Sequence, residues 1–284
     1  MINYHFHDQR SSDGSDPLHA HCEAAVAAGI RDICVTNHAE ILGPDGDWVA
    51  DFREMRDRFM AVRQSVAECS ARFPGLRIRL GAELEYRREW TDAFDRLTAE
   101  VPFDFVIGSV HIVDGMNISG GPERDRFFVD RSQEHAYQRY FDEVVEMILW
   151  GGFDVVGHFD LIKRFGHRHY GRYQPERYGD VIRRALAEMA HRGIGIEINT
   201  SGVGQAPGSS YPDVKILAWA REARVPFLTL GTDSHSPRAF AAGLREGIEV
   251  ASLAGWDKVA TFEHRRPSSG LSMETLVSWA SSSG

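Results

Sequence analysis

The amino-acid sequence predicts a single α/β domain built as a barrel of parallel strands. Short apolar runs, several of them β-branched and bounded by glycine or proline, alternate along the chain with longer amphipathic segments. This alternation is typical of parallel β/α units, and about seven such units favour a barrel over an open sheet. No linker, internal repeat or low-complexity block divides the 284 residues, a length that is normal for an α/β barrel.

The expected strands lie at residues 2–5, 32–36, 77–82, 104–109, 154–157, 194–198 and 227–231. The expected helices repeat apolar residues at spacings of three and four, and they lie at 17–28, 50–71, 130–149, 175–191, 213–223 and 238–252. Pro17 follows Asp16, as suits a helix start. We expect the serine-rich segment 268–284 to be a loosely attached tail or to hold one last short helix, built on Leu271, Met273, Leu276, Val277 and Trp279.

Composition and charge argue against several classes of protein. Apolar residues make up 43% and charged residues 26%, which is ordinary for a globular domain, and no window approaches the ~18 to 20 apolar residues of a membrane span. The formal net charge of −9 disfavours nucleic acid as a partner. The three cysteines lack CxxC spacing and the start of the chain lacks the features of a signal peptide, so we expect a reducing compartment, the cytoplasm. A monomer and a homodimer are both left open.

Histidines and carboxylates follow one expected strand after another. The carboxyl ends of parallel barrel strands form one face, where active sites lie, so these residues can converge. The clusters are His5-Phe6-His7, Thr36-Asn37-His38, Gly81-Ala82-Glu83-Leu84-Glu85, Ser109-Val110-His111, His158-Phe159-Asp160 and Asp233-Ser234-His235. An HxH pair or a lone histidine is a weak signal, but six clusters at six strand ends are hard to attribute to chance. Because unpaired buried charges destabilise a fold, we infer a metal site.

The ligand types narrow the choice of metal. Imidazole and carboxylate without thiolate suit Zn, Mn or Fe, whereas Mg prefers oxygen alone. There are more candidate ligands than one ion takes, so two or three divalent ions are expected. Such sites favour the hydrolysis of phosphoesters or amides. Glu83 is the expected ligand after the third strand, and Glu85 is the alternative.

The ordered motifs HxH, TxH, GxE, SxH, GH and DxH resemble those of the PHP superfamily, named for polymerase and histidinol phosphatase. They span residues 5–235. Segments 108–111, 158–163 and 197–202 are similar to the histidinol-phosphate phosphatase branch. The resemblance implies a distorted (β/α)7 TIM-like barrel, a three-metal site and a phosphatase activity on a small phosphomonoester, L-histidinol phosphate in that branch.

The resemblance also implies a role for each matched position. It places the first ion on His5, His7, Glu83 and Asp233. It lets Glu83 bridge to a second ion, which is also held by His111 and His158. It places the third ion on His38 and His235, with Asp13 at the remaining position. A hydroxide that bridges two ions would attack phosphorus in line, and the catalytic residues would be Glu83, Asp233 and His235.

The sequence departs from the family's pattern at several positions. Asn3 stands where the family often has Asp, and Asp13 stands where it often has His. After segment 197–202, Gly204 and Ser209 replace the Arg and Glu that histidinol phosphatases commonly carry. If that Arg binds the substrate phosphate, another cation must replace it. The candidates for substrate binding are Lys163, Arg164, Asn199 and Arg238.

The remaining histidines carry no functional expectation. We expect His19 and His21 to be solvated or to cap the first helix, and His167 and His169 to lie in a loop. His135, His191 and His264 are expected at the surface, in or beside helices.

No GxSxG or GxxxxGK[ST] motif supports a serine nucleophile or a nucleotide triphosphatase. The alternatives left open are a phosphodiesterase or nuclease, and a catalytically inactive metal-binding regulatory protein.

Overall fold

The protein is described by a computed structural model that covers residues 1–42, 47–121, 124–268 and 270–282. In these residues, parallel strands pair in the order β1 (Ile2–Asn3), β2 (Asp32–Val35), β5 (Arg77–Glu85), β6 (Phe105–Ser109), β9 (Val155–Val156), β10 (Gly195–Asn199) and β11 (Leu228–Gly231). The first and last strands of this order also meet, because the Tyr4 N–H donates to the Leu230 carbonyl at 2.9 Å. The predicted strands and the distorted (β/α)7 barrel are therefore confirmed.

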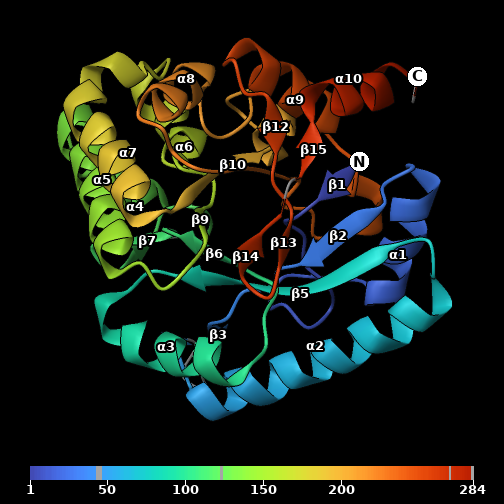
Figure 1. Ribbon diagram of the computed structural model, residues 1–284. Helices are drawn as coiled ribbons and strands as arrows, with labels where there is room; N and C mark the ends of the chain where they lie inside the picture. Colours follow the sequence, from blue (N-terminus) through green and yellow to red (C-terminus); the bar gives the residue numbers. More distant parts are fainter. Residues whose placement is uncertain (43–46, 122–123, 269, 283–284) are drawn as a thin grey trace.

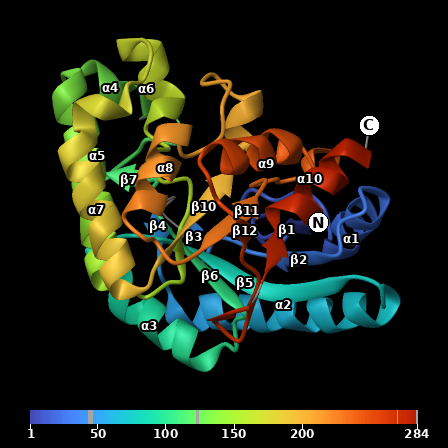
Figure 2. The ribbon, with the colours of Figure 1, turned by 45° about the horizontal axis from the view of Figure 1, so that its top comes forward.

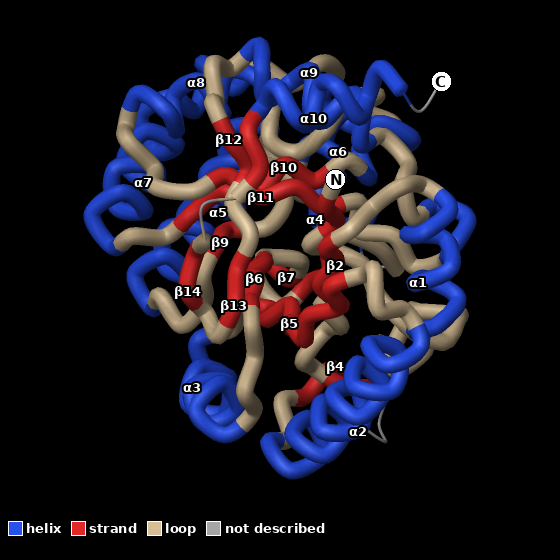
Figure 3. Tube along the Cα trace, turned by 45° about the vertical axis from the view of Figure 1, so that its right-hand side comes forward, coloured by secondary structure: helices blue, strands red, loops and turns tan. Residues whose placement is uncertain are grey.

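Helices surround the strands, which occupy the centre of the molecule (Figures 1, 2 and 3). They are α1 (Leu18–Ala27), α2 (Phe52–Arg72), α3 (Thr91–Glu100), α4 (Arg124–Val129), α5 (Gln133–Trp150), α6 (Lys163–Tyr170), α7 (Gly179–Arg192), α8 (Val214–Glu222), α9 (Leu244–Leu253) and α10 (Met273–Ser282). Each of the six predicted helices is present. The early starts predicted at 175 and 238 correspond to 3-10 turns at Pro175–Tyr178 and Pro237–Ala239.

Helix α5 shows how the sequence determines a helix of this barrel. Ser132 caps its start by accepting a hydrogen bond from the His135 N–H at 3.3 Å, and Gly151 ends it in a left-handed conformation with φ of 75°. The apolar residues at spacings of three and four face inward and are buried; among them are Tyr137, Tyr140, Phe141, Val144 and Ile148. Their burial against the sheet fixes the orientation of the helix.

Helix α6 was expected to be a loop, and that expectation is wrong. His167 and His169 lie within it. Phe165 and Tyr170 are its only large apolar side chains, which is too few to show the apolar period from which a helix could be predicted. The helix is attached through the buried Phe165 and through Gly166, where a Cβ would collide with Tyr137. Packing with the rest of the protein therefore determines its structure.

Short two-stranded pairings lie outside the barrel, at β3–β4 (Ile41–Leu42, Trp48–Val49), β7–β8 (Ile112–Val113, Met116–Asn117), β12–β15 (Lys258–Val259, Leu271–Ser272) and β13–β14 (Phe262–Glu263, Arg266–Pro267). The segment 268–284, for which a loose attachment was considered, contributes β15 and α10. Leu276 of α10 is fully buried, while residues 269 and 283–284 lie outside the described residues. Within the described chain, no helix combines the length and apolar character needed to span a membrane.

The hairpin β13–β14 is attached at the end of the barrel where the strands begin. The Tyr4 hydroxyl bridges Asp32, at the start of β2, and the hairpin, because it lies 3.0 Å from Asp32 Oδ1 and 3.3 Å from the Phe262 N–H. Asp154, just before β9, accepts from Arg265 Nε at 3.1 Å and from the Val106 N–H at 2.8 Å. These contacts fix the N-terminal ends of several strands to one hairpin.

We predict that Asp154→Ala destabilises the barrel by about 1–3 kcal/mol, because it leaves the buried Val106 N–H and Arg265 Nε without their acceptor. Urea unfolding followed by circular dichroism measures the change. Glu249→Ala, at an exposed position of α9, is the control and should change the free energy of unfolding by less than about 0.5 kcal/mol. Equal stability of the two variants would contradict the role given to Asp154.

Candidate metal centre

The Glu83 carboxylate lies at the centre of a group of histidines at the carboxyl ends of the strands. It is 1% exposed. Among the described residues, ring nitrogens within 3.7 Å of its oxygens belong to His158 (2.9 Å), His5 (3.2 Å), His38 (3.2 Å), His7 (3.5 Å) and His111 (3.7 Å). The sequence places these five side chains at four strand ends, and the barrel brings all of them to one carboxylate.

One group of four ligand atoms lies on the Oε2 side of Glu83. His5 Nε2 and His7 Nε2 are 3.2 and 3.5 Å from Glu83 Oε2, and 3.5 and 3.2 Å from Asp233 Oδ1. Four ligands placed tetrahedrally at about 2.0–2.1 Å from a zinc ion are separated by about 3.3 Å. The distances from each of these two imidazoles to each of the two carboxylates are therefore close to the spacing between ligands of a tetrahedral ion.

A second group lies on the Oε1 side. Glu83 Oε1 is 2.9 Å from His158 Nε2, which is 3.1 Å from His111 Nε2. Each oxygen of Glu83 thus faces a different set of imidazoles. This is the arrangement expected of a carboxylate that bridges two cations.

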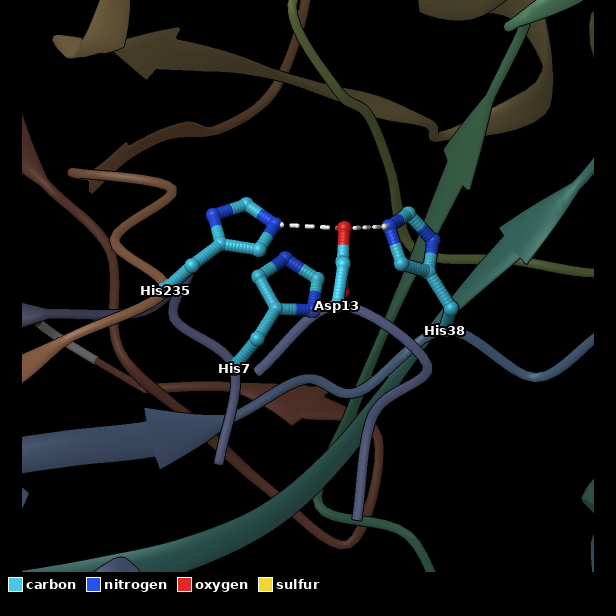
Figure 4. Close-up of side chains that lie close together, drawn as sticks. All are labelled: His7, Asp13, His38 and His235. Atoms are coloured by element: carbon cyan, nitrogen blue, oxygen red, sulfur yellow. Dashed lines mark ion pairs between the residues drawn. The ribbon is translucent and has the colours of Figure 1, made fainter. Parts of the chain in front are cut away.

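A third group lies nearest to solvent and consists of His7, Asp13, His38 and His235 (Figure 4). Asp13 Oδ2 is 2.8 Å from His235 Nε2 and 3.5 Å from His38 Nε2. His38 also faces inward, with Nδ1 3.2 Å from Glu83, so this ring can serve the second or the third group. The Asp13 side chain is 46% exposed, which makes this group the most open of the three.

The residues present fit a divalent cation. Three buried atoms in the middle of the cluster, His5 Nε2, His38 Nδ1 and Glu83 Oε2, have no well-formed hydrogen bond among the described residues. Buried polar atoms without hydrogen bonds are costly, and a cation at this position would satisfy all three. The donor set contains imidazole and carboxylate without thiolate, as Zn, Mn and Fe prefer.

Electrostatics in the cluster hold protons where cations would bind. Burial opposes the charge of His5, but the carboxylates of Glu197, Glu83 and Asp233 outweigh it and raise the pKa of His5 well above its usual value. In the same way burial opposes the charge of Glu83, and His5 with His38 outweighs it and holds the pKa of Glu83 well below its usual value. Burial lowers the pKa of His7 to about 4, so that ring is neutral.

Two buried carboxylates orient the imidazoles from behind. Glu197 Oε1 lies 2.6 Å from His5 Nδ1, and Glu85 Oε2 lies 2.7 Å from His111 Nδ1. Each accepts a hydrogen bond from Nδ1 of its histidine, so Nε2 faces the centre and can offer a lone pair to a cation once it has lost its proton. The structure thus places Glu85, the alternative ligand, behind His111 and not at the centre of the cluster. Glu197 was not predicted as a functional residue, although an acid between two isoleucines of a buried strand was a usable signal.

Glycine makes room for this second layer of carboxylates. A Cβ on Gly231, at the end of β11, would come within 2.6 Å of Glu197 Oε1 and would also collide with His5. A Cβ on Gly157, just after β9, would come within 2.8 Å of Ser109 Oγ. The close approach of the strands therefore requires glycine at these two positions.

Asn3 has a complete set of partners that requires its amide. Its Oδ1 accepts hydrogen bonds from the N–H groups of His5 (3.3 Å) and Thr232 (3.1 Å). Its Nδ2 donates to Thr232 Oγ1 (2.8 Å) and to the Phe240 carbonyl (3.0 Å). Because an ionised aspartate could not donate to that carbonyl, asparagine suits this position in place of the family's aspartate.

The expected substrate-binding residues lie in different surroundings. A cavity of about 530 Å³ opens beside the metal cluster, and its lining includes Arg164 together with Asp13, His111 and His235. Lys163 is buried and donates to Asp160 Oδ2 at 3.1 Å and to the Ser210 carbonyl at 2.7 Å. Arg238 is exposed on the 3-10 turn. Neither of these two lines that cavity, so Arg164 is the one of the three candidate cations that does.

Asn199 lies at the edge of the metal cluster. Its Nδ2 is 3.3 Å from Asp233 Oδ2 and 3.3 Å from Glu197 Oε2, while its Oδ1 accepts from Ser201 Oγ at 2.7 Å. Asn199 thus holds the Asp233 carboxylate so that Oδ1 faces His7.

His21 was expected to be solvated or capping, and that expectation is wrong. It is fully buried between Phe6 and Phe240, with ring centroids 5.2 and 5.8 Å away, and burial lowers its pKa to about 4. The buried face of α1 repeats at three and four residues through Leu18, His21, Cys22 and Ala25, so the helical period was the signal that placed it inside. The structure confirms that His19, His135, His191 and His264 are exposed, the last on the hairpin β13–β14.

We predict that Glu197→Gln weakens zinc binding about 10- to 100-fold without removing a ligand. The two oxygens of Glu197 accept hydrogen bonds from His5 Nδ1 and, at 2.9 Å, from the His158 N–H. A glutamine side chain has a single oxygen and cannot accept both of them. Competition with a chromophoric chelator measures the affinity, and the exposed Glu249→Gln is the control. An unchanged affinity in Glu197→Gln would refute its positioning role.

Metal binding should release protons near neutral pH. The pKa values of His5 and His38 are raised, so the metal-free chain holds these imidazoles protonated, and an ion must displace the protons. The apparent affinity should therefore rise as the pH increases from about 6 to about 8. Calorimetry in two buffers of different ionisation enthalpy counts the protons released. Identical heats in both buffers would show that the imidazoles are already neutral.

Comparison with known proteins relates this geometry to a family. The PHP domain model matches residues 3–201. The histidinol-phosphatase of Lactococcus lactis subsp. lactis is 27% identical over 272 residues, which cover 92% of this chain and 94% of that protein. A probable histidinol-phosphatase of Deinococcus radiodurans is 25% identical over 268 residues, which cover 94% of this chain and 98% of that protein.

The fold has a close counterpart among crystal structures. The histidinol phosphate phosphatase of Lactococcus lactis subsp. lactis, crystallised with zinc, L-histidinol and phosphate, has a TM-score of 0.80 at 24% identity. The match covers 94% of this chain and 98% of that one. The family match extends over well more than half of the sequence and includes most of the clustered histidines. The chain belongs to the PHP domain family.

Proposed function

We propose that this chain is a metal-dependent phosphatase that hydrolyses a small phosphomonoester, with L-histidinol phosphate as the first candidate. The observation that carries the proposal is the buried Glu83 carboxylate with its histidines beside an open cavity of about 530 Å³. Relatives named histidinol-phosphatase align with nearly the whole chain, which supports this reaction class.

The proposed ligand sets follow the three groups of side chains. The first ion would be held by His5, His7, Glu83 and Asp233. The second would be held by Glu83, His111 and His158, and the third by Asp13, His38 and His235. When bound, two or three Zn, Mn or Fe ions would supply an activated water nucleophile and neutralise charge on the phosphoryl oxygens.

The protein's own groups would orient and balance charge around the phosphate. Glu197 and Glu85 keep the His5 and His111 rings fixed, which lowers the reorganisation needed during reaction. Arg164 on the cavity wall is the cation that would contact the phosphate in place of the arginine that is absent at position 204. A local cation is needed because the chain as a whole carries a net charge of −9.

We predict chelator-sensitive release of phosphate from L-histidinol phosphate when the protein is supplied with zinc or manganese. His7→Ala should lower metal content and turnover together, since His7 belongs to two of the ligand groups. His135→Ala, on the exposed start of α5, should change neither. A phosphate-release assay over a panel of small monoesters, with metal analysis of each variant, measures both quantities.

The same panel separates the proposal from its alternatives. Turnover of other monoesters alone would keep the proposed chemistry, and the altered loop 203–210 would then account for the different substrate. Cleavage of a diester dye without any monoester would replace the proposal with a phosphodiesterase. Full metal content without turnover of any phosphoester would replace it with an inactive metal-binding protein.

A further inference from the structure

Three arginines surround one buried phenylalanine beside the catalytic cavity. The guanidinium carbons of Arg124, Arg164 and Arg168 lie 4.1, 5.0 and 5.3 Å from the centroid of the Phe165 ring. Arg124 begins α4, whereas the other two lie on α6. We call these three side chains the arginine cluster. Stacking on the ring fixes the positions of the cations while leaving their N–H groups available for hydrogen bonds.

Among the described residues, one acidic side chain pairs with the positive charge of the arginine cluster. Arg124 pairs with Asp125 at 3.3 Å, and Asp125 is 58% exposed. In the part of the chain that the structure describes, Arg164 and Arg168 make no ion pair and no side-chain hydrogen bond. Like charges held close together repel one another, and an anion between them would relieve this repulsion. The chain carries 41 acidic residues, yet Asp125 is the one described carboxylate that pairs with the cluster.

The arginine cluster lines a cavity of about 290 Å³ whose remaining walls are Phe165, Gln205 and Ala206. Among the residues that the structure describes, no carboxylate lines this cavity. Gln205 Oε1 accepts a hydrogen bond from the Tyr211 hydroxyl at 2.7 Å, so the Gln205 amide N–H groups remain as further donors. The lining therefore offers hydrogen-bond donors and positive charge, with an apolar floor, which is the chemistry that a tetrahedral oxyanion requires.

Arg164 connects this cavity to the catalytic one, because it lines both of them. The loop that supplies Gln205 and Ala206 is the loop in which the sequence departs from the histidinol-phosphatase pattern. Residues of the altered loop and the arginine cluster thus line the same cavity.

We propose that the arginine cluster is a second anion-binding site, adjacent to the metal centre, that takes a phosphate-type oxyanion. Two sources share this chemistry. One is a second anionic group on the substrate, which would make bisphosphorylated compounds better substrates than simple monoesters; this part rests on the proposed phosphatase function. The other is free inorganic phosphate, which would bind whether or not the chain hydrolyses esters.

Binding is tested first, with sulfate as the probe and the zinc-loaded full-length chain in a calorimeter. Arg168→Gln removes an exposed cation that has no ion pair among the described residues, so the fold should be retained, and thermal unfolding checks this. We expect Arg168→Gln to weaken sulfate binding at one site about tenfold or more, as for the loss of a hydrogen bond to a charged group. Arg184→Gln, on the exposed face of α7, is the matched control and should bind as the unmodified chain does.

Kinetics then separate the two sources. If the site takes a second substrate group, Arg168→Gln should raise KM about tenfold more for fructose 1,6-bisphosphate than for fructose 6-phosphate. If it takes free phosphate, the KM ratio should stay the same, and the inhibition constant of inorganic phosphate should rise instead. Identical sulfate binding, KM ratios and inhibition constants in the unmodified chain, Arg168→Gln and Arg124→Gln/Arg168→Gln would overturn the proposal. If the unmodified chain hydrolyses no monoester, the proposed phosphatase function is refuted. The sulfate titrations would still test whether the arginine cluster binds an anion.

Discussion

The buried Glu83 carboxylate is the constraint on which the architecture of the site depends. A carboxylate that is 1% exposed needs opposite charge from every direction in which its oxygens point. The barrel supplies this charge by ending neighbouring strands in histidine, so that ligands distant in sequence meet at one carboxylate. A second layer, formed by Glu197 and Glu85, then fixes the rings whose nitrogens face Glu83. Every part of this arrangement depends on how closely the strands approach one another.

The strands, and the clustering of histidines and carboxylates at their ends, could be predicted from sequence because both leave local patterns. Each strand is a short apolar run, and His5, His38, His111 and His158 stand at or just after such runs. The carboxyl ends of the strands in a parallel barrel lie on one face, so residues that follow successive apolar runs were predicted to lie close together. The small side chains at Gly157 and Gly231 are part of the same pattern, although the atoms that they accommodate are visible only in the structure.

The features that sequence missed depend on contacts between distant segments. Helix α6 is too short to show an apolar period, and it is held by contacts with distant segments, such as the packing of Gly166 on Tyr137 and the hydrogen bond from the Tyr170 hydroxyl to the Phe128 carbonyl. The role of Glu197 became clear only when its partner, His5, was found 192 positions away. The arginine cluster joins Arg124 to two residues of α6, and no local spacing could have related them.

The hairpin β13–β14 has a consequence for how the site is assembled during synthesis. The Tyr4 hydroxyl, next to the ligand His5, contacts a residue 258 positions later in the chain, and the barrel closes through the contact of Tyr4 with Leu230. A nascent chain that has not yet reached β11 and this hairpin already contains most of the histidines, but it lacks the strand that closes the barrel and the cluster residues Asp233 and His235. The cluster can therefore be completed only after the last barrel strand and the residues that follow it have been synthesised.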